Sequence, residues 1–163
     1  MSHHGRPVPR DGHLAARVPR PRASTYAVAM QVQPDHALTP GLVARVELTV
    51  TDADTALAVG SGDVPVLGTP RLLALAEAAT VAATARHLPA GSTTVGTRVE
   101  LDHRAATPVG RTVTAQARLT AVDRRRLVFE VAVTEGGQTV AEGRVERVLV
   151  DRNRFVERAG QPA

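Results

Sequence analysis

Two ionisable side chains of this sequence stand where apolar residues are expected. Glu77 is the only charged residue between Arg71 and Arg86, inside the otherwise apolar stretch LGTPRLLALAEAATVAATARHL. His103 follows a run of alternating apolar and polar residues and takes an apolar position in it. Burying a carboxylate and an imidazole is costly unless they meet each other, a substrate or water. Together, such groups are the ones that proteins use to move protons during a reaction.

Each residue also has a purely structural explanation. Glu77, Thr80 and Thr84 fall on one stripe of a helix, which could be the side of that helix nearest to water. His103 ends its strand, where half-exposed histidines are common. On the residues alone, both explanations stay open.

Alternating apolar residues predict the strands that would position these side chains. The first covers residues 42–50, and a short helical turn over 51–60 follows it. Four more runs come after the long apolar stretch and are predicted to form an antiparallel meander, joined by ATPVG, DRR and the hairpin signal EGGQ; they span 93–104, 111–122, 126–135 and 138–150. Two inward faces are predicted, one of Val113, Ala115, Ala117 and Leu119, the other of Leu127, Phe129, Val131 and Val133.

The stretch around Glu77 predicts a long helix that is apolar on nearly every side. Thr69 is expected to cap it, Pro70 suits its first position, and Arg86 and His87 close it. Such a helix has to be covered by a sheet. The order of elements therefore predicts an α+β fold in which an antiparallel sheet wraps around one long central helix.

Strand parity directs His103 toward that helix. One face of its strand is predicted to carry Val95, Thr97, Val99, Leu101 and His103. The opposite face is predicted to carry Gly96, Arg98, Glu100 and Asp102. The first set is the apolar one, so the imidazole is expected to point at the helix that carries Glu77.

Composition indicates one domain with a basic N-terminal tail. The 163 residues are 43% hydrophobic but only 2% aromatic, so Val, Leu and Ala must build the core. The net charge of +4 is that of residues 1–29, which are rich in Arg and Pro and are predicted to be disordered. The domain is expected over residues 30–158, with a flexible C-terminus at 159–163. Alternatively, Met30 is the biological start of the chain.

Composition also restricts the class of protein. Cysteine is absent, which excludes a disulfide framework and a thiolate metal site. No apolar run reaches the roughly 20 residues of a membrane span, and the N-terminus lacks the apolar segment of a secretory signal. We expect a cytoplasmic protein with no metal, no cofactor and no nucleic-acid or membrane partner, although a basic tail could touch RNA or membrane phosphates.

Short motifs at fixed spacings give the chain a family resemblance. GTPRLLALAE supplies Thr69 and, eight residues later, Glu77, and LDHRAATPVG supplies His103 twenty-six residues beyond that. TTVGT carries Gly96, seven residues before the histidine, and VERVLV carries Arg147. With these spacings and this order of elements, more than a hundred residues of the chain resemble the hotdog-fold acyl-CoA thioesterases, and within them the fluoroacetyl-CoA thioesterase branch.

The resemblance implies a hotdog fold, thioester hydrolase activity and a homodimer. It implies a catalytic set of Thr69, Glu77 and His103, in which Glu77 is general base or nucleophile and His103 orients Glu77 and moves the proton. Thr69 would donate its hydroxyl to the carboxylate or to the substrate. Gly96 would let the backbone approach the acyl group, and Arg147 would contact the substrate.

Helix geometry limits how this set can act. Eight residues of helix rise about 12 Å, so Thr69 cannot touch Glu77 within one straight helix. Either Thr69 lies in a loop that folds back, or the two act on opposite ends of a bound thioester, or a partner chain brings one of them.

One segment departs from the family. The fluoroacetyl-specific enzyme carries a phenylalanine in a lid ahead of the catalytic threonine, whereas GSGDVPVLGT has no aromatic residue. We therefore expect hydrolysis of a short-chain acyl-CoA to free acid and CoA, not specifically of fluoroacetyl-CoA. Two alternatives remain: a hotdog dehydratase, for which we find no hydratase-type segment, and a non-catalytic acyl-CoA-binding dimer of the same fold.

Overall fold

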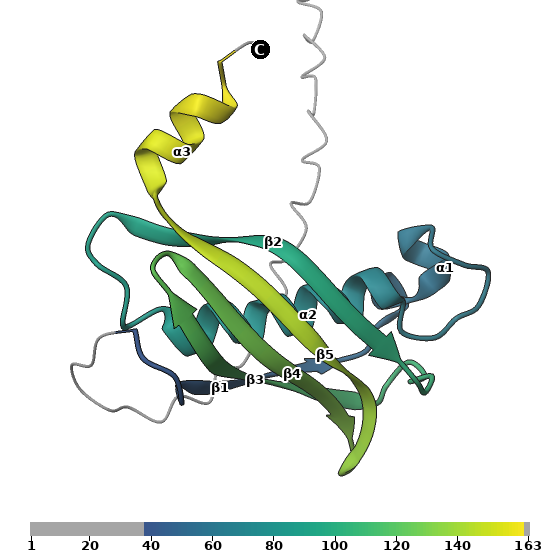
Figure 1. Cartoon of the computed structure of the whole chain (residues 1–163). Helices are drawn as coiled ribbons and strands as arrows, with labels where there is room; N and C mark the ends of the chain where they lie inside the picture. The colour runs from purple at the N-terminus through teal and green to yellow at the C-terminus, as the bar shows by residue number, and fades with distance from the viewer. Residues whose placement is uncertain (1–37, 162–163) are drawn as a thin grey trace, which may run out of the picture.

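The computed structural model describes residues 38–161, and the predicted tail over residues 1–29 lies outside that range. In chain order the elements are β1 (Val43–Thr49), the 3-10 turn η1 (Asp52–Asp54), α1 (Ala56–Val59), α2 (Thr69–Thr84), β2 (Ser92–His103), β3 (Thr112–Asp123), β4 (Arg126–Glu135), β5 (Gln138–Asp151) and α3 (Arg152–Ala159). The strands form one antiparallel sheet that curves around α2 (Figure 1). This confirms the expected α+β architecture. No helix of the described range is long and apolar enough to cross a membrane.

The strand order differs from a simple meander. The sheet runs β1-β3-β4-β5-β2, so only β3, β4 and β5 follow one another, and β2 pairs with β5 instead of with β3. The segment between β2 and β3 is not a tight turn. The Thr107 carbonyl accepts the Leu67 N–H at 2.8 Å, and the Gly110 N–H donates to the Val50 carbonyl at 2.8 Å. These contacts lead the chain past the start of α2 to β3, which lies beside the edge strand β1 on the other side of the sheet.

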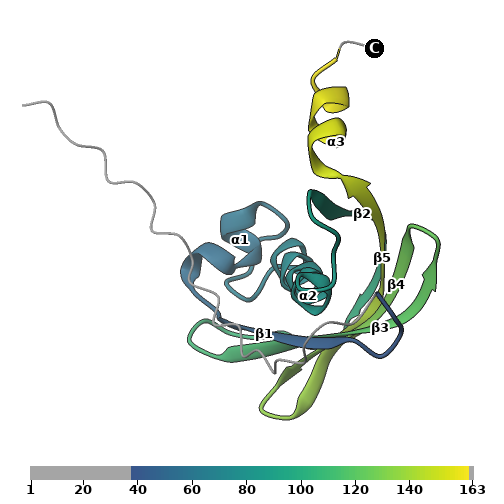
Figure 2. The same cartoon turned by 90° about the vertical axis from the view of Figure 1, so that its left-hand side faces the viewer.

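The core lies between α2 and the concave face of the sheet, which Figure 2 shows end-on. All eight residues of the two predicted inward faces are buried, with exposed fractions of 0–4%. From α2 the sheet covers mostly small or branched side chains: Leu72, Leu75, Ala76, Ala79, Thr80, Ala83 and Thr84. Phe129 is the only aromatic side chain in this core. The helix can therefore lie close to the strands.

A β-bulge corrects the predicted parity of β2. The pairing with β5 shifts register between Gly96 and Arg98, so Thr97 is an extra residue. Val99, opposite the fully buried Val145, lies on the helix side as predicted. Gly96, opposite the buried Arg147, also lies on that side, which places Val95 on the outer face. The predicted faces were therefore wrong for Gly96 and Val95, because the extra residue of a bulge reverses the alternation of faces along the strand.

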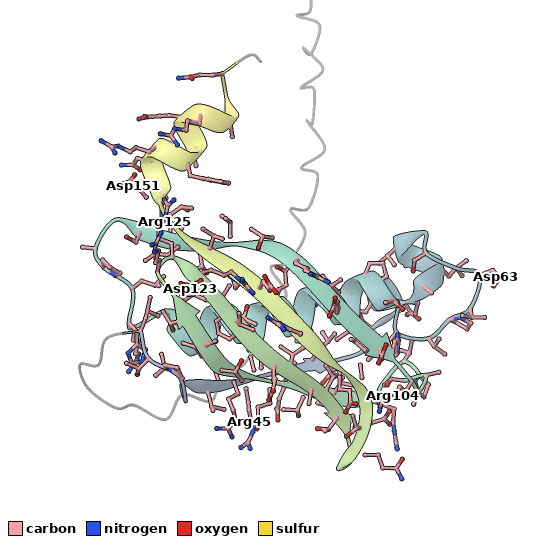
Figure 3. The ribbon with its side chains drawn as sticks, viewed as in Figure 1. Arg45, Asp63, Arg104, Asp123, Arg125 and Asp151 are labelled. Carbon is pink, nitrogen blue, oxygen red and sulfur yellow. The ribbon has the colours of Figure 1, made fainter. Side chains whose placement is uncertain are left out.

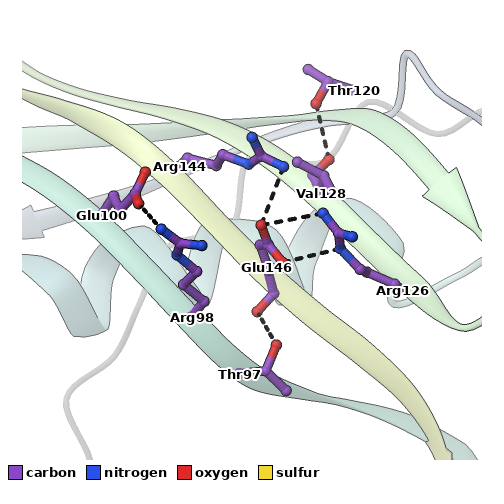
Figure 4. A network of polar contacts seen from close by, with 8 residues as sticks. All are labelled: Thr97, Arg98, Glu100, Thr120, Arg126, Val128, Arg144 and Glu146. Atoms are coloured by element: carbon purple, nitrogen blue, oxygen red, sulfur yellow. Dashed lines mark hydrogen bonds and ion pairs between the residues drawn. The ribbon is translucent and has the colours of Figure 1, made fainter.

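The convex face of the sheet carries several ion pairs at its surface. Glu146 accepts from Arg126 and Arg144, and Arg98 bonds Glu100 (Figure 4). Each such surface pair contributes little to stability, about 0–1 kcal/mol. These pairs make the face largely polar, although Val128, opposite Glu146, is buried there.

A cluster around Asp54 fixes the start of α2. Arg71 donates to the Asp54 carboxylate at 2.6 Å, and the Thr51 N–H and hydroxyl donate to it at 2.8 and 2.6 Å. The Gly68 N–H donates to the Asp54 carbonyl at 2.9 Å. Burial by itself raises the pKa of Asp54, but the bonds from Thr51 and Arg71 outweigh it and lower that pKa below its ordinary value. The turn before α2 is thereby tied to the helix itself.

We expect Asp54→Asn to lower the free energy of unfolding by about 1–3 kcal/mol at pH 7, because a buried, charge-assisted network loses its acceptor. The folded-state pKa is lowered, so the carboxylate stabilises the fold above its ordinary pKa and loses this effect as the pH falls through the folded-state value. Urea unfolding at pH 7 and pH 3 should show a difference between the two proteins that shrinks in acid. Asp63→Asn, in the exposed loop before α2, is the matched control. A difference that does not change with pH would contradict this account.

Candidate active site

Thr69 and His103 form a hydrogen-bonded pair at the start of α2. The threonine hydroxyl and His103 Nδ1 lie 2.9 Å apart. Thr69 is the first helical residue and not the cap as predicted, because Gly68 takes the cap position and its carbonyl accepts the N–H groups of Arg71 and Leu72. The Thr69 hydroxyl is therefore not consumed in capping and is available to the histidine.

The two ends of this pair differ in exposure. Thr69 is exposed, whereas His103 Nε2 is buried and makes no hydrogen bond to any described residue. A buried N–H without an acceptor is rarer in proteins than an acceptor without a donor. We therefore assign the proton to Nδ1, which then donates to the Thr69 oxygen. In this tautomer the hydroxyl hydrogen of Thr69 is left to point toward a bound molecule.

Glu77 lies on α2 about two turns after Thr69, and Arg147 of β5 holds its carboxylate. Arg147 Nη1 lies 3.0 Å from Glu77 Oε1, and its Nε and Nη2 donate to the hydroxyl and the carbonyl of Thr94 at 3.0 and 2.9 Å. Burial lowers the pKa of Arg147, and the charge of Glu77 partly offsets that effect. The arginine side chain is 7% exposed, but that of Glu77 is 33% exposed. One carboxylate oxygen is thus bound, while Oε2 has no partner among the described residues.

Gly96 leaves room for the carboxylate at the edge of the sheet. A Cβ added to Gly96 would collide with Glu77 Oε1. Gly96 itself is exposed and lies in β2, which is an edge strand. Glu77 can therefore be reached from the free edge of the sheet, across the Gly96 backbone.

The predicted site residues thus form two separate groups within one chain. Thr69 and His103 are brought together, as are Glu77, Gly96 and Arg147, but no hydrogen bond or ion pair in the described range links Glu77 to His103. The helix is continuous from Thr69, so Thr69 does not fold back, and about 12 Å of helix separates it from Glu77. The described residues contain no group of three or more His, Asp or Glu side chains suited to hold a metal ion.

Arg147, expected to contact a substrate, bonds Glu77 and Thr94, and its contact with a substrate stays a prediction. Thr94 itself was missed, because alternation around the bulge gave no reason to place it on the inner face. Its position two residues before Gly96 was the available signal.

Comparison with solved structures gives the class of this fold. A hot-dog-like protein from Thermanaerovibrio acidaminovorans superposes with a TM-score of 0.67 at 25% identity, covering 74% of this chain and 89% of its own. The fluoroacetyl-CoA thioesterase FlK superposes with a TM-score of 0.72 at 29% identity, covering 78% of this chain and 100% of its own. A variant of FlK has also been solved in complex with acetyl-CoA. The fold is the hotdog fold of thioesterases.

Sequence comparison gives the family. Residues 50–153 match the model of the fluoroacetyl-CoA-specific thioesterase family, so the chain belongs to that family. The fluoroacetyl-CoA thioesterase of Streptantibioticus cattleyicolor is 37% identical over 90 residues, which are 55% of this chain and 65% of that protein. The match thus spans a little under two thirds of that relative.

We expect Arg147→Met to lower the free energy of unfolding by about 2 kcal/mol, because it leaves Glu77 without its cation and two Thr94 oxygens without a donor. Glu77 is partly exposed, which keeps the loss below that of a fully buried pair. Adding Glu77→Gln to Arg147→Met should recover part of the loss, with a coupling of about 1 kcal/mol in a double-mutant cycle measured by urea unfolding. Strictly additive effects would show that the two side chains do not interact in solution.

Proposed function

We propose that this chain hydrolyses a short-chain acyl-CoA thioester of the cytoplasm to free acid and CoA. The observation that carries the proposal is the presence of two half-sites in one chain: an exposed threonine hydroxyl backed by His103, and a carboxylate held by Arg147 at an open edge. These are the donor and the base that addition of water to a thioester needs. Membership of a thioesterase family supports the same activity.

The chemistry follows from the free atoms of each half-site. Water attacks the thioester carbonyl carbon while Glu77 Oε2 accepts its proton. The hydroxyl of Thr69 donates to the oxyanion that forms, and His103 Nδ1 holds that hydroxyl in place. The C–S bond then breaks, and the CoA sulfur leaves with the proton from Glu77. Arg147 and Thr94 fix the carboxylate.

A homodimer brings the half-sites together. Within one chain the rigid helix keeps Thr69 and Glu77 apart, so we favour a site shared between two chains. β2 is an edge strand of 12 residues with unpaired backbone groups, and such an edge invites pairing with a second copy. Antiparallel pairing of two β2 edges about Val99 and Glu100 sets Gly96 of one chain opposite His103 of the other. Glu77 of one protomer would then face the Thr69–His103 pair of its partner.

The segment before α2 favours a general short-chain substrate. Apart from Ser61 and Asp63, the side chains of the loop over residues 60–68 are aliphatic, with Val64 48% exposed and Leu67 buried. It offers no aromatic ring that could select a fluorinated acyl group. We therefore do not assign fluoroacetyl-CoA as the specific substrate.

A non-catalytic acyl-CoA-binding dimer is the second candidate. It shares the fold and the open edge, and it needs neither Glu77 nor the Thr69 hydroxyl for proton transfer. One measurement distinguishes the two functions. Only the enzyme releases CoA thiol from acetyl-CoA at a rate that depends on these two side chains.

We expect Glu77→Gln to lower the rate of acetyl-CoA hydrolysis by at least about a hundredfold, because the base is removed while shape is kept. Thr69→Val should cost about a hundredfold through loss of the oxyanion donor, and Thr69→Ser, which keeps the hydroxyl, less than about tenfold. Release of CoA thiol measures the rate, and circular dichroism checks the fold. Full activity in a well-folded Glu77→Gln variant would leave the acyl-CoA binder as the better assignment.

The shared site predicts complementation between inactive variants. When Glu77→Gln and Thr69→Val chains are unfolded together and refolded as mixed dimers, one site of each heterodimer has both intact side chains. About a quarter of wild-type activity should return, since half of the dimers are mixed and each holds one good site. Each variant refolded alone is the control. No recovery, with heterodimers demonstrated by mass spectrometry of tagged chains, would place the whole site in one protomer.

A further inference from the structure

The arginines of the described range fall into two groups by side-chain partners. Eight of them bond a carboxylate or an amide or hydroxyl oxygen: Arg45, Arg71, Arg98, Arg104, Arg111, Arg126, Arg144 and Arg147. Seven described arginines make no such bond, namely Arg86, Arg118, Arg124, Arg125, Arg152, Arg154 and Arg158. Five of these seven belong to the β3–β4 turn and to α3. We call these five the arginine end of the molecule: Arg124, Arg125, Arg152, Arg154 and Arg158.

Two hydrogen bonds fix the segments that carry the arginine end. The Leu149 N–H donates to the Arg125 carbonyl at 2.7 Å, which joins the β3–β4 turn to the last residues of β5. Asp151 accepts the Arg154 N–H at 2.9 Å and so caps α3. Figure 3 shows Arg125 and Asp151 at the base of α3, with Asp123 further down, toward the body of the sheet. Three acids lie among the five arginines, Asp123, Asp151 and Glu157, so the arginines are in excess.

Helix α3 is uncovered on all sides. It projects from the end of β5 away from the sheet (Figures 1 and 2), and none of its residues is buried. Phe155 is 45% and Val156 65% exposed. Eight residues are too few for a helix that is stable by itself in water. An exposed aromatic ring among unpaired guanidinium groups is suited to stack on a nucleobase while the arginines bind its phosphates.

We propose that the arginine end and Phe155 bind the phosphorylated adenosine end of the CoA substrate. This inference rests on the proposed function for the identity of the ligand. Charge complementarity favours it, because CoA carries several phosphate charges and the described range holds no second cluster of unpaired arginines. Phe155 would stack on the adenine, and Arg152, Arg154 and Arg158 would bind the phosphates.

The distance from the carboxylate to α3 fits the pantetheine arm. β5 carries Arg147 at the site and becomes α3 at Arg152, so five residues of strand, about 17 Å, separate them. The arm between the CoA sulfur and its first phosphorus has roughly thirteen bonds. If each bond adds the same length as in an extended peptide backbone, the arm spans about 16 Å. The exposed edge of β2 runs alongside, from Gly96 opposite Arg147 to Ser92 opposite Asp151. A thioester above Gly96 would therefore place its phosphates beside α3.

The test compares substrates with and without phosphates. For the triple variant Arg152→Gln, Arg154→Gln and Arg158→Gln we expect KM for acetyl-CoA to rise about tenfold or more with kcat within twofold. KM for acetyl-pantetheine, which has no phosphate, should not change. Arg118→Gln removes an unpaired exposed arginine from the middle of β3 and is the matched control, with KM unchanged for both substrates. An unchanged KM for acetyl-CoA in the triple variant would overturn the inference.

A second substrate distinguishes CoA from a phosphopantetheine arm on a carrier protein. Phe155→Ala should raise KM for acetyl-CoA at least about fivefold but leave KM for acetyl-4′-phosphopantetheine unchanged, because only CoA has the adenine. Equal effects of Phe155→Ala on both substrates would contradict adenine stacking. Light scattering on each variant is the structural check. A variant that splits the dimer would instead assign α3 to contacts between protomers and overturn the proposal.

Binding of free CoA separates this inference from the proposed function. Isothermal titration with the Glu77→Gln protein needs no hydrolysis, and adding the triple arginine substitution should weaken CoA binding about tenfold or more. If this holds while the wild-type chain hydrolyses no acyl-CoA, the arginine end is a CoA site of a binding protein. If the wild-type chain hydrolyses acetyl-CoA and the triple arginine substitution does not change the affinity for CoA, only the inference about α3 fails.

Discussion

The carboxylate of Glu77, set in the middle of an apolar helix, is the constraint on which the rest of the site depends. A charge on a helix that is wrapped by a sheet is tolerated only with a partner, and Arg147 supplies it from β5. That arginine must itself be satisfied, which Thr94 does with two oxygens. The strand that brings Thr94 then passes over the carboxylate at Gly96, where a Cβ would force Glu77 Oε1 to move. One partly exposed ion pair thus accounts for the chemistry of three positions in two strands.

The same ion pair explains why β2 is bulged where it is. Thr94 and Gly96 must face α2 beside Glu77, while Val99 and His103 must face it further along. Strict alternation cannot meet both demands, because positions 96 and 99 have opposite parity. The additional residue at Thr97 resolves the conflict, and its hydroxyl donates to the Glu146 carbonyl across the strands (Figure 4). Bulges next to functional positions commonly re-aim side chains in this way.

Much of the fold could be predicted from the sequence because it depends on local periodicity. The inward faces of β3 and β4 follow from alternation alone, and the length of α2 follows from an unbroken apolar stretch. The pairing of β2 with β5 could not be found this way, because strand order is decided by contacts between residues distant in sequence. The bulge was hidden for a similar reason, since nothing within TTVGTR marks Thr97 as the residue without a partner. Motif spacing named five positions near the helix, but the division of their contacts into Thr69 with His103 and Glu77 with Arg147 needed the three-dimensional arrangement.

This division bears directly on how such a site can work. A straight helix holds its first residue and its third turn at a fixed separation, so the threonine and the carboxylate of one chain cannot touch each other directly. In the proposed homodimer, a second copy of the helix, related by a two-fold axis at the free edge of β2, would remove the difficulty without bending either helix. The edge strand would then serve twice, once to join the sheets and once to bring Gly96 and the carboxylate behind it to the partner's threonine. Association and catalysis would on this view be inseparable, because the interface that satisfies the unpaired edge is also the one that completes the site.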